Sequence, residues 1–130
     1  MGVLLIADRD KDGRKQLADF FDNAGYQVVE TDSAAQVLLD TFKKEAQVIL
    51  LSGEFDEIPA ADLIPIIKKC NRNLTIILVS NEESLPQIRK LRSEGIFYHA
   101  LKPVNAADKE ELKLAVQCAF ANVGSASRQH

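Results

Sequence analysis

Short apolar runs alternate with segments of helical periodicity along the chain, and this alternation is the strongest constraint on its fold. The runs have the length and composition of strands buried on both faces, and they are residues 3–7, 26–31, 47–51, 74–79 and 97–101. Between the runs, apolar residues recur at helical spacing, as at Leu17, Phe21 and Ala24. Five strands alternating with five helices predict an α/β domain with right-handed crossovers and a doubly wound parallel sheet.

Local signals place several helix ends. We expect Asp10 or Asp12 to cap the first helix, and Ser33 to cap the second in a capping box. Pro65 lacks the N–H that a helix interior uses. The third helix is therefore expected either to begin as late as Asp62 or to kink at the proline.

Length and charge limit the classes of protein. The chain has 130 residues, which suits one domain, and we assign residues 1–122 to it and residues 123–130 to a flexible polar tail. The net charge of −3 has the wrong sign for binding phosphate backbones, so we expect no direct nucleic-acid partner. No apolar run approaches the roughly 18 residues of a membrane span. The apolar N-terminus lacks the basic region of a secretory signal, so we expect a cytoplasmic protein without membrane insertion.

The cysteines and histidines form no metal-binding pattern. Cys70 and Cys118 are too far apart in the sequence for a C-x-x-C pair, and the two histidines are His99 and His130. We therefore expect reduced thiols and no structural metal.

Polar residues follow the strands where a doubly wound sheet places its ligands. In such sheets the functional crevice lies beyond the carboxyl ends of the strands. This rule selects the polar residues at the ends of four runs, namely Asp8 and Arg9, Ser52 and Gly53, Ser80 and Asn81, and Lys102.

The order of these strand ends resembles the receiver domain of two-component response regulators. An acidic cluster that begins at Asp8 follows the first run, and Ser52 follows the third. The hydroxyl of Ser80 follows the fourth run, and Lys102-Pro103 follows the fifth. The resemblance covers the chain to about Asn122 and implies a flavodoxin-like (βα)5 fold with strand order 2-1-3-4-5. It also implies a cis Lys102–Pro103 bond, and it makes His99 the position that often carries a switching aromatic residue in the family.

Two positions depart from the receiver pattern. The second metal-binding acid is replaced by Arg9, and the phosphate-accepting aspartate is replaced by Ser52. A serine hydroxyl is protonated at pH 7 and needs a neighbouring base to attack phosphorus, whereas a carboxylate is already ionised. Arg9 also repels Mg²⁺, which prefers carboxylate and water oxygens. We therefore expect no Mg²⁺ or other cofactor, and we expect Lys102 to pair with Asp8, with Arg9 sharing it, or with Glu54.

These departures predict a degenerate receiver that is not phosphorylated on aspartate, is not an enzyme and signals through protein contacts. The partner would be a histidine kinase, an output domain or another receiver, including a homodimer through residues 87–92, strand 97–101 and residues 108–122. Two alternatives remain: phosphorylation of Glu54 or Asp56, or binding of a small ligand such as a flavin in the same crevice. A hydrolase triad of Ser52, His99 and Asp8 is disfavoured because the G-x-S-x-G turn is absent from the sequence.

Overall fold

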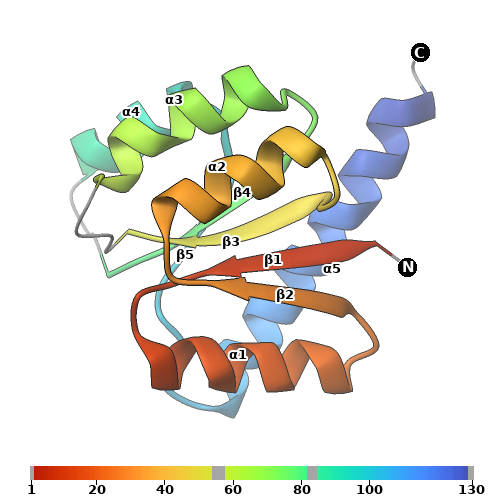
Figure 1. Ribbon diagram of the computed structural model, residues 1–130. Helices are drawn as coiled ribbons and strands as arrows, with labels where there is room; N and C mark the ends of the chain where they lie inside the picture. The colour runs from red at the N-terminus through yellow and green to blue at the C-terminus, as the bar shows by residue number, and fades with distance from the viewer. Residues whose placement is uncertain (1, 54–57, 82–84, 129–130) are drawn as a thin grey trace.

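The computed structural model describes residues 2–53, 58–81 and 85–128. Strands and helices alternate along these residues (Figure 1). The strands are β1 (Val3–Ala7), β2 (Gln27–Thr31), β3 (Val48–Ser52), β4 (Thr75–Val79) and β5 (Ile96–Ala100). The helices are α1 (Lys11–Asn23), α2 (Ala34–Lys43), α3 (Ala60–Cys70), α4 (Leu85–Ser93) and α5 (Ala106–Arg128). Each predicted strand is found within about one residue of its expected bounds.

The strands form one parallel sheet in the order β2-β1-β3-β4-β5, which confirms the predicted topology. Helices α2, α3 and α4 cover one face of the sheet, and α1 and α5 cover the other (Figure 1). Cys70 and Cys118 belong to helices on opposite faces and are free thiols, as the sequence predicted.

Side chains of the central strands alternate between two cores because successive residues of a strand point to opposite faces. Leu5, Ile49 and Ile76 pack under α2, α3 and α4. Leu4 and Leu50 pack instead under α1 and α5. All residues of β3 and β4 are buried, which explains why these runs read as continuously apolar in the sequence.

Helix α3 begins earlier than the proline suggested. It begins at Ala60 and holds Pro65 in its interior, so the start at Asp62 was wrong. The proline loses one helical hydrogen bond. Three side chains of the helix, Leu63, Ile64 and Ile67, are fully buried, and this burial offsets the lost bond.

The other helix ends partly confirm the predictions. Asp10 is the N-cap residue of α1, although its side chain makes no capping bond. The Ser33 side chain accepts a hydrogen bond from the Gln36 amide at 3.3 Å and caps α2 as predicted. Helix α5 continues to Arg128, past the end expected near Asn122. The division into residues 1–122 and a tail of residues 123–130 stays a prediction. In the described parts of the chain, no helix combines the length and apolar character of a membrane span.

Candidate functional site

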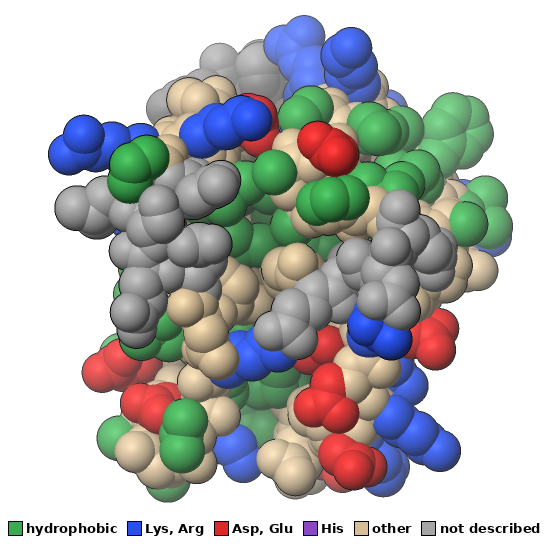
Figure 2. All heavy atoms as spheres, turned by 90° about the vertical axis from the view of Figure 1, so that its left-hand side faces the viewer, with side chains coloured by type: hydrophobic (Ala, Val, Ile, Leu, Met, Phe, Trp, Pro, Cys, Tyr) green, Lys and Arg blue, Asp and Glu red, His purple; other side chains and the backbone are tan. Residues whose placement is uncertain are grey.

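The carboxyl ends of four neighbouring strands bring the predicted site residues to one edge of the sheet. Ala7 of β1 lies beside Leu51 of β3, so Asp8 and Ser52 follow on adjacent strands. Ser80 follows β4, and its amide donates to the Ala100 carbonyl of β5 at 3.0 Å. Figure 2 views the molecule from this side and shows acidic and basic side chains intermingled around a central hollow.

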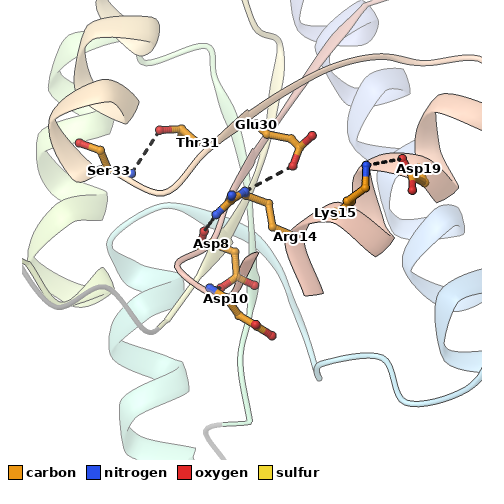
Figure 3. A network of polar contacts seen from close by, with 8 residues as sticks. All are labelled: Asp8, Asp10, Arg14, Lys15, Asp19, Glu30, Thr31 and Ser33. Carbon is orange, nitrogen blue, oxygen red and sulfur yellow. Dashed lines mark hydrogen bonds and ion pairs between the residues drawn. The ribbon is translucent and has the colours of Figure 1, made fainter. Parts of the chain in front are cut away.

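Asp8 is held by its own loop. It is 9% exposed, and its Oδ1 accepts a hydrogen bond from the Asp10 amide at 3.0 Å. Its carbonyl oxygen accepts a second bond from Arg14 Nη1 at 2.8 Å, and Arg14 Nε lies 3.3 Å from Glu30 Oε1 (Figure 3). Arg14 thus connects the loop after β1 to α1 and to β2. Sequence reasoning missed this role because Glu30 is distant along the chain.

A cavity of about 250 Å³ opens beside Asp8. Its lining combines carboxylates with ammonium groups, contributed by Asp8, Asp10, Asp12, Lys102 and Lys109. The sequence suggested Asp10 and Asp12 only as helix caps and did not single out Lys109. The arrangement is a mixed-charge crevice at the place where the strand-end rule predicted one.

The two serines are buried at neighbouring strand ends. Ser52 is 2% exposed and Ser80 is 6% exposed. Ser80 Oγ lies 3.0 Å from His99 Nε2, so the hydroxyl and the predicted switch residue share a hydrogen bond. His99 also lines a second hollow of about 350 Å³ with Lys102 and Asp108. Both serines lie at the carboxyl-end edge of the sheet, and their roles stay predictions.

The surroundings of Lys102 differ from two expectations. Every described peptide bond is trans, so the predicted cis Lys102–Pro103 bond was wrong. The trans form of an X–Pro bond is favoured by about 0.5–1 kcal/mol, and Lys102 lines the cavity from that backbone, with its amide donating to Asn81 Oδ1 at 3.3 Å.

The expected ion pair between Asp8 and Lys102 is also not found among those that join described residues, which are Arg14–Glu30 and Lys15–Asp19. The Asp8 carboxylate turns instead to the Asp10 amide. Glu54 and Asp56, the other carboxylates considered, lie outside the described residues.

The donor set does not fit a divalent cation. At the three positions where receivers carry acids, this chain has one carboxylate, Asp8, together with the cation Arg9 and the neutral hydroxyl of Ser52. The described residues hold no group of three His, Cys, Asp or Glu side chains placed to bind a metal.

Asp8→Ala is expected to destabilise the fold only modestly. Without an ion pair to Lys102, the substitution removes one side-chain bond to a backbone amide, which is worth about 0.5–2 kcal/mol. Chemical denaturation of wild type and variant measures the difference. A loss of about 3–5 kcal/mol would instead indicate a buried ion pair broken by the substitution.

Comparison with known proteins assigns the chain to a family. Residues 4–117 match the family model described as "Response regulator receiver domain". The chain is 26% identical over 117 residues to the transcriptional regulatory protein GlrR of Escherichia coli K12, covering 90% of this chain and 26% of that protein. It is 29% identical over 102 residues to the transcriptional regulator NtrC of Bradyrhizobium, covering 78% and 21% respectively. It thus spans about a quarter of the length of these relatives.

Solved structures share the fold at lower identity. The signal receiver domain of a putative LuxO repressor from Vibrio parahaemolyticus superposes with a TM-score of 0.89 at 13% identity, covering 99% of this chain and 97% of that one. A CheY-like receiver from Methanospirillum hungatei gives a TM-score of 0.83 at 17% identity, covering 100% and 99%. The sheet order, the strand-end site and the family match together show that this chain belongs to the response regulator receiver domain family.

Proposed function

We propose that this receiver domain is degenerate: it is not phosphorylated on aspartate, it performs no catalysis, and it signals through protein contacts. The supporting observation is Ser52, which ends β3 at the acceptor position and is 2% exposed. A serine there lacks the ionised oxygen of an aspartate, and its hydroxyl is protonated at pH 7 and needs a neighbouring base before it can attack phosphorus.

The charges around Ser52 support the same proposal. Phosphoryl transfer depends on cations that neutralise the oxygens of the moving group and on a nucleophile in line with it. Lys102 retains a cation at the cavity, but Arg9 replaces a metal-facing acid. The site therefore keeps a group that attracts anions and loses two groups that receivers use for metal binding and covalent chemistry.

The exposed face of β5 and α5 is the proposed docking surface. Phe97, Tyr98 and Leu114 are 41%, 44% and 60% exposed. They line a largely apolar hollow of about 390 Å³ together with Cys118. Exposed apolar side chains gathered in this way are typical of interaction sites. A histidine kinase, an output domain or a second receiver are the partners that the family membership favours.

The proposal predicts a wild-type protein that responds neither to Mg²⁺ nor to phosphodonors. Titration with MgCl₂ is expected to leave the melting temperature unchanged. If Mg²⁺ did bind the native protein, a concentration of one hundred times its dissociation constant would add about 2.7 kcal/mol of stability and raise the melting temperature visibly. Incubation with acetyl phosphate is expected to leave the intact mass unchanged, with an intact receiver as the positive control for the reagent. A hydroxylamine-sensitive phosphoryl adduct on Glu54 or Asp56 would overturn the proposal in favour of an alternative acceptor.

A further inference from the structure

The edge of the sheet opposite the site carries a concentration of positive charge. Because β3, β4 and β5 are parallel neighbours, the segments that precede them lie side by side at the amino ends of these strands. The last turns of α2, α3 and α4 and the loops after them supply the cations, which we call the amino-edge cluster: Lys43, Lys44, Lys68, Lys69, Arg72, Lys90 and Arg92. The same segments contain three acids, Asp40, Glu45 and Glu94, although the whole chain has 19 acidic and 16 basic residues.

Lys68 joins two of the segments in this cluster. Its Nζ donates to the Leu74 carbonyl at 2.8 Å and to the Arg72 carbonyl at 3.3 Å. Its stem packs against Gly95, where an added Cβ would lie 2.9 Å from Lys68 Cε. The half-buried position lowers the pKa of Lys68 by desolvation. Lys68 thus fixes the loop after α3 against the turn after α4, while the other six cations are exposed.

Exposed apolar side chains adjoin the cluster. Phe42 immediately precedes Lys43 and is 71% exposed, and Leu39, one turn earlier on α2, is 47% exposed. Ile66 is 41% exposed on α3, which packs against α2. A large exposed aromatic side chain beside flexible cations can supply both the anchor and the charged rim of an interface.

Helix dipoles explain only part of the cluster. Cations in the last turn of a helix are favoured by its partial negative charge, which accounts for Lys43, Lys69 and Arg92. That effect falls off beyond the last turn, so it does not account for Arg72 in the loop after α3. It also gives no reason to expose Phe42.

We propose that the amino-edge cluster, with Phe42 and Leu39, binds a partner protein through an acidic segment that carries an apolar anchor. Lysines outnumber arginines in the cluster, so most of its cations act as mobile point charges that can each meet a carboxylate of an acidic segment, without the fixed geometry of bidentate recognition. The net charge of −3 and the three acids in the same segments also disfavour a nucleic acid. This surface lies at the opposite end of the strands from Ser52, so the proposal holds whether or not the acceptor site is active.

The test uses the full chain and a fluorescein-labelled amphipathic peptide of glutamate, leucine and phenylalanine. Fluorescence anisotropy is expected to show binding that weakens as salt rises. Lys43→Glu combined with Lys69→Glu should weaken binding about tenfold, from two lost ion pairs. Lys11→Glu combined with Lys15→Glu changes the net charge equally on α1 and should alter affinity less than about twofold, because charges beyond ~8 Å are screened at physiological salt. Phe42→Ser should cost about tenfold without changing the salt dependence.

Two further probes identify the class of partner. Phosphatidylserine vesicles and single-stranded RNA are offered to the same wild-type and variant proteins under the same conditions. Peptide binding that depends on the cluster, without cluster-dependent binding of vesicles or RNA, supports the proposal. Peptide affinity equal in wild type and in the Lys43→Glu and Lys69→Glu variant overturns it. Stronger cluster-dependent binding of vesicles or RNA than of peptide also overturns it.

Discussion

Replacing Ser52 and Arg9 together with aspartate is expected to restore Mg²⁺-dependent stability. Asp8 already lies at the same edge with 9% exposure, so the two substitutions would give this edge a carboxylate at each of the three positions where receivers carry acids. Like charges held together destabilise the metal-free fold, and a divalent cation would relieve that repulsion. At one hundred times its dissociation constant the ion would add about 2.7 kcal/mol, which raises the melting temperature by roughly 10 °C.

The single variants separate the two changes. Ser52→Asp alone is expected to gain little from Mg²⁺ because Arg9 still stands at the position of the second metal-binding acid. The double variant is compared with its own metal-free form by differential scanning calorimetry, and circular dichroism checks that it is folded. A folded double variant whose melting temperature ignores Mg²⁺ would show that Arg9 and Ser52 are not the cause of the lost site. An equal response from Ser52→Asp alone would show that Arg9 does not matter.

The fold could be predicted because its determinants are local and repeated. β3 and β4 are buried on both faces, so their apolar runs are continuous, and a short continuous apolar run between turn signals is typical of a buried strand. Pro65 was misjudged because a proline penalty is local, whereas the burial of Leu63 and Ile67 that outweighs it comes from tertiary packing. The end of α5 was misjudged for a related reason, since small polar residues after Asn122 have weak helix propensity.

The site was predictable in position but not in its contacts. Parallel strands place their carboxyl ends together, so Asp8, Ser52 and Ser80 had to be neighbours. The hydrogen bond between Ser80 and His99 joins residues on different strands, and the bond from Arg14 to Glu30 joins a helix to another strand. Such pairings depend on side-chain directions, which the spacing of strand ends does not give. Lys102 was expected to pair with Asp8 or with Glu54; among the described residues Asp8 accepts a hydrogen bond from the Asp10 amide and forms no ion pair with Lys102, while Glu54 lies outside them.

Phe21→Ala is expected to cost about 3–5 kcal/mol of folding free energy, whereas Phe42→Ala changes it by less than about 0.5 kcal/mol. Phe21 on α1 is fully buried and packs edge-on against Tyr26, with ring centroids 5.8 Å apart. Phe42 makes the matched control because it is the same residue type on a helix and is 71% exposed. Urea denaturation measures both changes, and anisotropy with the acidic peptide measures binding on the same samples.

The two phenylalanines thus separate folding from recognition. Phe21→Ala leaves a cavity beneath α1, the helix whose Arg14 holds the loop of Asp8, so the loss of stability should extend to the site edge. Phe42→Ala should keep its stability and lose peptide affinity, because an exposed side chain contributes little to the fold and can contribute much to an interface. A large loss of stability in Phe42→Ala would mean that this ring is already buried in the free protein, and the apolar anchor assigned to the amino edge would then belong to the core.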